Sequence, residues 1–556
     1  MKGAFNTPFM KNILCFLFSF LTVASLKAQT EKQLQTILED NGLPGIQLAC
    51  TVNGKTTAYN LGTAKAGLKK PVTSATIFRA GSLGKTVFAY AVLRLCDRGV
   101  LSLDTPLMRY IGSYNRYDPK DPRYSMITAR MVLSHTSGLA EFPDFETGEP
   151  VRLLFAPGSG YSYSGEGYWF LQKVVEKITA MPFEQLMQQE VFKPLGMQSS
   201  TYVQSNNMDA EVLGPVSPDL APMLPNAAFS LLTNAHDYNV FLQNLLAGKG
   251  LKPATQKLMF SRQTKTPSAA DTDKTFNWGL GVGLEQGNKQ NLIWHWGKTD
   301  DFISLFVANP GKGQSLVFFT RGKALKAADQ IVSLFLGRQT ALTMRAQHFR
   351  YDNPDAMPEL FAALRKHGFD DVSKIFNGLA RKGKQFSEAD LNYYGNVLLK
   401  QGKNREALAI FKQQATLFPQ SPLAYSRVAA AAENLGGANL ALTSYRKALM
   451  LDSTNVATIN HIKALEKGAP TSTAHLKMFE GKYKRADNGM FLDISAVGNK
   501  LVITQSWDGG QLEFFRVDEF DFYNEEPGFT LKFTKDEQGR IWKAFVNDRP
   551  LEWVRK

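Results

Sequence analysis

The chain has 556 residues, more than a single hydrophobic core usually accommodates, so we expect two or three domains. Hydrophobic residues make up 44% and charged residues 21%, the proportions of an ordinary globular protein. The formal net charge is +14, but the basic residues are dispersed and do not interleave with aromatic residues. We therefore expect a generally basic surface and no nucleic-acid partner.

The N-terminus has the pattern of a secretory signal. Lys2 and Lys11 precede the short apolar run ILCFLFSFL over residues 13–21, and small residues follow up to Ala28. The run is shorter than the roughly 20 apolar residues that span a bilayer. We expect a signal peptide over residues 1–28 and an exported, periplasmic or secreted protein; an uncleaved anchor is the alternative.

The cysteines do not form a disulfide framework. Once residues 1–28 are removed, only Cys50 and Cys96 remain, each in an apolar segment where a buried thiol is expected. No group of His and Cys residues has the spacing of a metal site. We expect neither a metal nor an organic cofactor.

Residues 29–345 alternate between strand and helix patterns. The apolar strand 45–52 meets the strand 56–61 through Asn53-Gly54, a strong hairpin signal. A helix follows Ser82 and ends at Gly99. Two further strands are predicted over residues 303–307 and 315–320.

Residues 355–468 are predicted to be helical, with an internal repeat. Small and aromatic residues recur 34 residues apart: Gly395, Gly402, Ala407 and Phe411 are matched by Ala429, Gly436, Ala441 and Tyr445. This period resembles the tetratricopeptide repeat, whose small residues let helices approach while the aromatic fills the gap between units. Such a stack could bind a protein partner or act as a spacer.

The C-terminal residues 474–556 are predicted to form a small β domain. A linker over 467–473 precedes short alternating runs that are broken by turn residues. Strands at this regular spacing indicate a small barrel or sandwich.

The candidate chemistry lies in Ser82-Leu83-Gly84-Lys85. Positions i and i+3 share one face of a helix, so the lysine can reach the serine hydroxyl and accept its proton. Lysine must be neutral for this role, which requires burial or nearby positive charge. The helix N-terminus disfavours the ammonium, and its free N–H groups can stabilise an oxyanion.

The surrounding residues exclude three other interpretations: a second Ser-x-x-Lys site, a phosphate loop and an α/β-hydrolase elbow. The same spacing occurs in Ser444-Tyr445-Arg446-Lys447, where we expect a coincidence on a packed helix, because only Ser82 stands at a helix entrance after a glycine. A phosphate loop requires glycine where Arg79 stands. The G-x-S-x-G elbow of α/β-hydrolases is absent.

Four segments in order carry a resemblance: FRAGSLGKTVFAYAVLRLCDRGVLSLDTPLMRYI, MVLSHTSGL, APGSGYSYSGEGYWFLQKVVE and WHWGKTDDF. Together they resemble the group of class C β-lactamases, penicillin-binding proteins and family VIII esterases, over about residues 30–340. The resemblance implies a β-lactamase/transpeptidase-like α+β domain, with an antiparallel sheet flanked by helices, as the first part of a multidomain protein.

The resemblance also assigns roles. Tyr163, rather than nearby Tyr161, would relay protons. Gly165 stands where the family has an asparagine, which puts efficient β-lactam turnover in doubt. The third motif is His295-Trp296-Gly297, in which Gly297 would let the substrate backbone approach. The backbone N–H of Lys298 would complete the oxyanion hole with that of Ser82.

His295 replaces a permanently charged lysine of the family. We expect its protonated form to bind an acidic substrate better, so that affinity falls as the pH rises through its pKa. The alternative is a packed residue between Trp294 and Trp296.

The sequence thus predicts a serine hydrolase that transfers an acyl group to water. Esters, D-amino-acid peptides from the cell wall and β-lactams are the candidate small substrates, in that order. The alternative is a catalytically weak sensor or scaffold that binds protein partners through the repeats and the β domain.

Overall fold

The computed structural model describes residues 27–141, 151–214, 224–264, 276–287, 290–299, 301–322, 326–337, 351–466, 473–485, 490–498, 500–506, 510–524, 530–547 and 552–556. The predicted signal peptide lies outside this part except for its last two residues, as does most of the predicted linker. Among the described helices, none combines the length and the hydropathy that crossing a bilayer requires.

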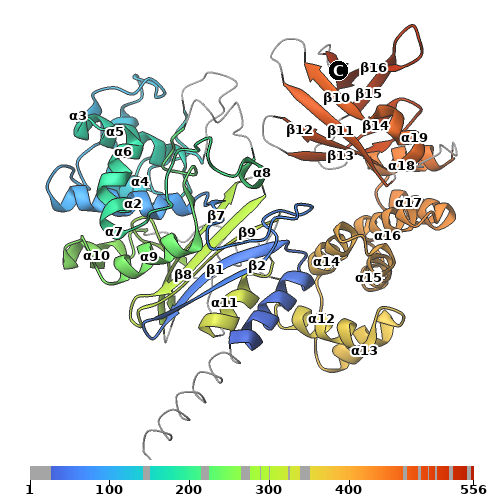
Figure 1. Ribbon diagram of the computed structural model, residues 1–556, viewed down its shortest axis with the longest axis horizontal. Coiled ribbons are helices and arrows are strands. Elements are labelled where there is room, and N and C mark those ends of the chain that lie inside the picture. The colour runs from blue at the N-terminus through green and yellow to red at the C-terminus, as the bar shows by residue number, and fades with distance from the viewer. Residues whose placement is uncertain are drawn as a thin grey trace, which may run out of the picture. The chain divides into compact units, whose positions relative to one another are not determined.

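The chain divides into two compact units. The first comprises residues 1–212 and 224–350, and the second comprises residues 213–223 and 351–556. Each unit is described by itself below, and Figure 1 labels the elements of both.

The first unit is built on a seven-stranded antiparallel sheet with the order β2-β1-β9-β8-β7-β6-β5. The predicted hairpin is confirmed, because Asn53 and Gly54 both take positive φ between the first two strands. The strands of this sheet are β1 (Gly45–Val52), β2 (Lys55–Gly62), β5 (Phe276–Trp278), β6 (Gly283–Gly287), β7 (Gln290–Thr299), β8 (Phe302–Asn309) and β9 (Gln314–Arg321).

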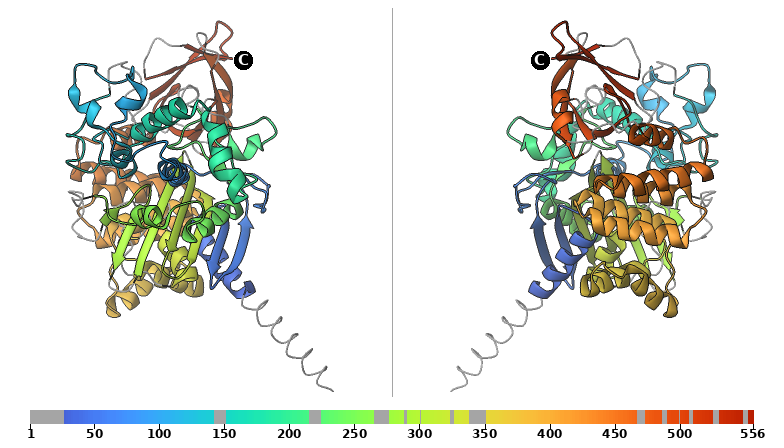
Figure 2. Two further views of the ribbon diagram at one scale, coloured as in Figure 1. Left: turned by 90° about the vertical axis from the view of Figure 1, so that its left-hand side faces the viewer. Right: turned by 90° about the vertical axis from the view of Figure 1, so that its right-hand side faces the viewer.

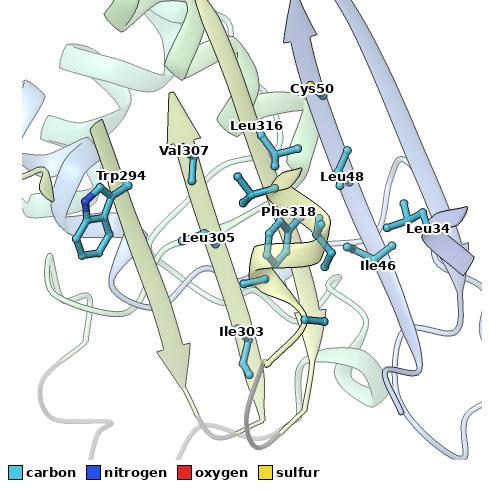
Figure 3. Close-up of a cluster of buried hydrophobic side chains, with 14 of the residues drawn as sticks. Leu34, Ile46, Leu48, Cys50, Trp294, Ile303, Leu305, Val307, Leu316 and Phe318 are labelled. Carbon is cyan, nitrogen blue, oxygen red and sulfur yellow. The ribbon is translucent and has the colours of Figure 1, made fainter. Parts of the chain in front are cut away.

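Helices cover both faces of this sheet, which explains why β1 and β8 are buried along nearly their whole length. On one face the helix over residues 27–40 and α11 (Ala328–Leu336) pack on the sheet, and Leu34, Leu48 and Phe318 lie in their shared core (Figure 3). On the other face lie α2 (Leu83–Asp97) and α9 (Ala235–Leu246). The predicted sheet flanked by helices is therefore confirmed.

The first unit also contains a second, small sheet and several short helical elements. A two-stranded sheet joins β3 (Phe78–Arg79) to β4 (Leu232–Thr233) just before Ser82. The other elements are α3 (Met108–Ile111), η1 (Pro122–Met126), α4 (Ala129–Leu133), α5 (Glu166–Thr179), α6 (Phe183–Met187), η2 (Gln188–Phe192), α7 (Lys193–Leu195), α8 (Ala210–Leu213) and α10 (Pro253–Met259).

The second unit begins with a row of helices, as predicted, in which neighbours pack side by side (Figures 1 and 2). They are α12 (Ala356–His367), α13 (Val372–Arg381), α14 (Glu388–Lys400), α15 (Asn404–Leu417), α16 (Pro422–Asn434), α17 (Ala438–Leu451) and α18 (Val456–Glu466). Their assignment to the tetratricopeptide family stays a prediction.

One packing detail of the repeat concerns Gly395 and Phe411. A Cβ atom on Gly395 would lie 2.2 Å from the ring of Phe411, so this glycine admits the ring between α14 and α15. The aromatic thus fills space inside the helical pair α14 and α15, and it belongs to the same core cluster as Ala424 and Val428 of α16. Ser444, which begins the second Ser-x-x-Lys spacing, is buried within α17.

The C-terminal strands form a closed barrel, which decides between the two predicted β architectures. The ring of Phe479 from η5 (Lys477–Phe479) lies against those of Phe522 and Phe533, with ring centroids 5.0 and 4.8 Å apart. Side chains therefore fill the interior of the barrel. A short helix α19 (Thr473–Leu476) precedes η5. The strands are β10 (Gly481–Arg485), β11 (Phe491–Val497), β12 (Lys500–Gln505), β13 (Gln511–Arg516), β14 (Asp521–Tyr523), β15 (Thr530–Lys535), β16 (Ile541–Val546) and β17 (Glu552–Arg555).

Candidate active site

The Ser-x-x-Lys motif has the predicted geometry. Ser82 is the residue from which α2 starts, and Lys85 lies one turn into the helix. The Lys85 Nζ atom donates a hydrogen bond to the Ser82 Oγ atom at 3.1 Å and a second one to the Ala228 carbonyl at 2.8 Å. The amine is thus anchored on one side and directed at the hydroxyl on the other.

Burial gives Lys85 the acid–base character that the chemistry requires. The side chain is only 1% exposed, and burial lowers the pKa of its amine to about 7, while the carboxylate of Glu141 opposes this shift. A substantial fraction of the amine is therefore neutral near pH 7. A neutral amine 3.1 Å from the hydroxyl can act as its proton acceptor.

Tyr163 lies beside this pair. Its ring centroid is 4.9 Å from Lys85 Nζ, and the Ser82 hydroxyl is close enough to lower the pKa of the phenol. Burial outweighs this effect and raises the pKa of Tyr163 well above its ordinary value. The Oη atom is buried, and among the described residues no atom forms a hydrogen bond of ordinary geometry with it. Tyr163 is therefore a protonated phenol beside the nucleophile.

The segment over residues 133–141 holds the loop that carries Tyr163. Its carbonyl groups accept hydrogen bonds on both sides of the tyrosine: His135 O from Ser162 N (2.9 Å), Ala140 O from Ser164 Oγ (2.8 Å) and Glu141 O from Gly165 N (2.8 Å). The contacts with Glu141 also fix the start of α5, where Gly165 takes the place of the family's asparagine. The departure at Gly165 thus removes a side-chain amide while the backbone there remains anchored.

Gly297 is required by a contact different from the one expected. A Cβ atom on this residue would lie 1.9 Å from the Ala80 carbonyl oxygen and 2.4 Å from Ser304 Oγ. The Ser304 hydroxyl itself donates to the Ala80 carbonyl at 2.8 Å. Strand β7 therefore approaches the chain's own turn before Ser82, and this contact by itself excludes a side chain. The expected approach of a substrate backbone at Gly297 stays a prediction.

The same close approach places the backbone of Lys298 against Gly81, the residue before Ser82. Gly81 has φ +53, and a Cβ atom there would lie 2.8 Å from the backbone nitrogen of Lys298. The N–H groups of Leu83, Gly84 and Lys85 already donate to carbonyls three residues earlier. The first amides of α2 are thus not free, which corrects part of the sequence-based expectation. The pairing of Lys298 N–H with Ser82 N–H at an oxyanion stays a prediction.

His295 lies at the site but is not the cation that its position suggested. It is 0% exposed, and burial together with the charge of Lys85 lowers its pKa to about 3. Its Nδ1–H donates to the Trp296 carbonyl at 2.6 Å, and its ring is 6.0 Å from that of Tyr163. The imidazole is therefore neutral at working pH, which leaves the expected pH-dependent recognition of a carboxylate without its cation.

His135 is a residue of the site that sequence reasoning did not single out. It belongs to the MVLSHTSGL segment and is 0% exposed. The Ser164 N–H donates to its Nδ1 atom at 3.0 Å, and its ring lies 4.3 Å from that of Tyr163. A lone histidine in an apolar segment carries no signal of such a role.

Neither cysteine lies among these groups. Cys50 is buried, whereas Cys96 is half-buried rather than fully buried as expected, and burial raises the pKa of both thiols to about 12. Within the described residues, no three His, Cys, Asp or Glu side chains are grouped so that they could hold a metal ion.

Comparison with known proteins found several that are similar to this chain. Penicillin-binding protein 4* of Bacillus subtilis is 20% identical over 386 residues, which cover 62% of this chain and 81% of the relative. Esterase EstB of Burkholderia gladioli is 31% identical over 212 residues, which cover 33% of this chain and 53% of the relative. A solved β-lactamase/D-alanine carboxypeptidase from Pseudomonas syringae aligns with a TM-score of 0.47 at 16% identity, over 56% of this chain and 98% of that one.

The family model described as Beta-lactamase matches residues 28–333, which is more than half of the chain. That range contains the Ser82 and Lys85 pair, the Tyr163 loop and the His295 strand. The chain therefore belongs to the β-lactamase family of serine hydrolases.

Proposed function

We propose that this protein hydrolyses carboxylic esters through an acyl-enzyme on Ser82, with Lys85 as the proton acceptor and Tyr163 as a proton relay. The observation that carries the proposal is the 3.1 Å contact between Lys85 Nζ and Ser82 Oγ, made by an amine whose pKa is lowered to about 7. A charged lysine in this place would hold the hydroxyl but could not take its proton.

The reaction proceeds in two half-reactions. Ser82 Oγ attacks the ester carbonyl while its proton passes to Lys85 Nζ, and the resulting oxyanion collapses with departure of the alkoxide. Tyr163 donates its phenolic proton to the leaving oxygen and is reprotonated from Lys85. In the second half, water gives up a proton to the neutral Lys85 amine and attacks the acyl carbon. The bond between the acyl carbon and Ser82 Oγ then breaks, Lys85 returns the proton to Ser82 Oγ, and the acid is released.

Two observations favour esters over D-amino-acid peptides and β-lactams. The neutral His295 supplies no cation for the carboxylate that those two substrate classes carry. Gly165 supplies no side-chain amide where the family has one. The likeness to EstB, a protein named as an esterase, points the same way.

The test combines labelling with a substrate panel. The purified protein is treated with a fluorophosphonate probe and assayed with p-nitrophenyl butyrate, a D-alanyl-D-alanine peptide and a chromogenic cephalosporin. We expect a covalent adduct on Ser82 and the highest kcat/KM on the ester. Ser82→Ala should lose the adduct and the activity, whereas Ser444→Ala, at the second Ser-x-x-Lys spacing, should keep both.

Two results would overturn the proposal. A chain that neither labels nor turns over any member of the panel would support the sensor or scaffold interpretation. Peptide hydrolysis faster than ester hydrolysis would retain the nucleophile but reassign the substrate class.

We also propose that the protein is exported, because the pattern of residues 1–28 is that of a secretory signal. Mass spectrometry of the N-terminus of the protein recovered from the producing cell tests this. A mature chain that begins near residue 29 is expected, and an intact Met1 in a cytoplasmic fraction would contradict it.

A further inference from the structure

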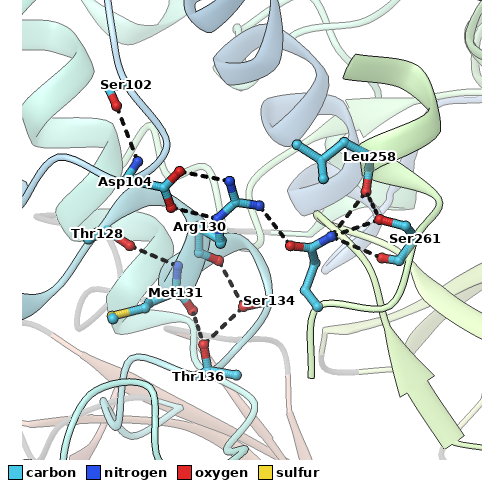
Figure 4. Close-up of polar contacts among 10 residues, drawn as sticks. Ser102, Asp104, Thr128, Arg130, Met131, Ser134, Thr136, Leu258 and Ser261 are labelled. Carbon is cyan, nitrogen blue, oxygen red and sulfur yellow. Dashed lines mark hydrogen bonds and ion pairs between the residues drawn. The ribbon is translucent and has the colours of Figure 1, made fainter. Parts of the chain in front are cut away.

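His135 occupies an unusual backbone position that several polar contacts maintain. Its φ is +57, a left-handed conformation that residues other than glycine seldom adopt. It follows directly after α4 and Ser134. Figure 4 shows how the turn is fixed: Ser134 Oγ donates to the Arg130 carbonyl at 2.8 Å and contacts Thr136 Oγ1 at 3.0 Å. The strained conformation is therefore imposed by the surrounding structure.

That conformation lets one residue hold the chain on both sides of Tyr163. The His135 carbonyl accepts the N–H of Ser162 at 2.9 Å, and its Nδ1 atom accepts the N–H of Ser164 at 3.0 Å. Between these two bonds its ring lies on the Tyr163 ring, with centroids 4.3 Å apart and planes tilted by 34°. The tyrosine is thus located by two hydrogen bonds and one ring contact from a single side chain and its backbone.

The chemistry of the imidazole suits this task. Because Nδ1 accepts a hydrogen bond, the ring carries its proton on Nε2 and is neutral. The charged and titratable groups that act on it are Lys85 and His295, and both of them, together with burial, hold its pKa well below the ordinary value. The acceptor at Nδ1 is therefore present over the whole working pH range.

We propose that His135 is a positioning residue for the proposed reaction: it fixes Tyr163 beside Ser82 by accepting the Ser164 N–H and by packing on the tyrosine ring. Its hydrogen bonds are made to the two residues that flank Tyr163, so its effect on the reaction passes through that tyrosine. This inference rests on the proposed function, because it gives Tyr163 the role of proton relay.

Two substitutions separate the acceptor from the ring. His135→Asn places Oδ1 at the covalent position of Nδ1, and asparagine tolerates positive φ. His135→Phe keeps a ring but leaves the Ser164 N–H without its acceptor. Asn234→Ala is the control, because it removes the N-cap of α9 and so lowers stability without removing either hydrogen bond that His135 makes to the Tyr163 loop.

The kinetic test uses ester hydrolysis with each variant. His135→Phe should lower kcat by about 10²-fold, the loss expected when a reacting group is misplaced by about 1 Å, with KM changed little. His135→Asn should keep kcat within about tenfold of the parent, and the Asn234→Ala control should keep the parent's kcat at a temperature where it is folded. In a Tyr163→Phe background, His135→Phe should add almost nothing, since its effect passes through the missing phenol.

Several results would overturn the proposal: full additivity of His135→Phe with Tyr163→Phe, equal loss in the Asn and Phe variants, or parent-like kcat in His135→Phe. A second measurement holds even for a protein without esterase activity. In ¹⁵N-histidine spectra, the signal lost in His135→Asn should show the neutral Nε2–H form with no titration between pH 5 and 9. A titrating ring or an Nδ1–H form would refute the acceptor role, whereas absent turnover with the expected spectrum would count against the proposed function alone.

Discussion

Replacement of Gly297 by alanine is a direct test of how the nucleophile is held. The added Cβ atom would lie 1.9 Å from the Ala80 carbonyl oxygen, and real Cβ atoms essentially never come closer than 3.0 Å to another heavy atom. Strand β7 and the turn before Ser82 would therefore have to separate by at least the difference, 3.0 − 1.9 = 1.1 Å. The obstacle is backbone, so no side-chain rotation relieves it.

The expected cost can be stated for stability and for rate. Overpacking of this kind costs about 1–3 kcal/mol, which for a domain of about 300 residues corresponds to a fall in Tm of roughly 2 °C per kcal/mol. A displacement of about 1 Å at a catalytic group costs about 10²-fold in rate. We therefore expect Gly297→Ala to lose far more activity than its Tm suggests.

The assay pairs thermal unfolding with kcat/KM for an ester substrate, both measured well below the lowered Tm. Gly311→Ala is the matched control, because the nearest atom to its new Cβ is Asn309 Oδ1 at an ordinary 3.5 Å. It should behave as the parent. A Gly297→Ala variant with parent-like Tm and rate would refute the close approach of β7 to the Ala80 carbonyl.

Four further measurements address Lys85, His295 and the helical segment. The charged amine of Lys85 is inactive and its pKa is lowered to about 7, so kcat/KM should rise as the pH increases through about 7; a flat profile from pH 5 to 9 would exclude it as the base. Lys85→Met should abolish hydrolysis yet raise the Tm. The gain in Tm should be largest at pH 7 and below and should shrink towards pH 10, because between pH 7 and 10 the unfolded chain keeps a proton on Lys85 that the folded chain releases. An unchanged Tm at pH 7 would contradict the burial of the amine. Since His295 has a pKa of about 3, matched esters with and without a carboxylate should show parallel kcat/KM profiles from pH 5 to 9, and divergence near pH 6.5 would restore a cationic His295. Gly395→Ala should lower the unfolding temperature of the helical segment, and Phe411→Leu should recover part of the loss, whereas Gly378→Ala, which meets no atom within 4 Å, should be neutral or stabilising.

Local sequence signals predicted much of the fold. The Asn53-Gly54 turn and the helix between Ser82 and Gly99 follow from backbone preferences of a few adjacent residues, and both are confirmed. In the barrel, the alternating runs of the sequence correspond to β11, β12, β13, β15 and β16, whereas β10, β14 and β17 lie outside them. Those strands are only 5, 3 and 4 residues long, too short for an alternation to stand out.

The candidate site was predicted where adjacent residues define it and missed where distant segments meet. The spacing of Ser82 and Lys85 is a property of one helix turn, so the sequence contains it. The reason for glycine at 297 lies in Ala80, more than two hundred positions earlier, and the contact appears only when β7 packs beside that turn. The neutrality of His295 likewise depends on burial among groups that the neighbouring sequence does not specify.

The structure also decides between the two ways in which a lysine can be made neutral. The sequence left burial and neighbouring positive charge as alternatives for Lys85. In the folded chain the depression of its pKa comes from burial, and Glu141, the charged group that acts on it, opposes the effect. The two nearby imidazoles, His135 and His295, have pKa values far below neutrality, so neither adds a positive charge at working pH.

Because burial sets the pKa of Lys85, that pKa depends on the exclusion of water from around the amine. A second lysine in place of His295 would lower the pKa of Lys85 further by repulsion, but it would also place two amines in one buried region. A neutral imidazole fills that place without the added charge. Entry of water around Lys85, caused by a cavity or by a displaced aromatic ring, would raise the pKa of the amine towards its ordinary value. The rate at neutral pH would then fall while the contact with Ser82 remained in place.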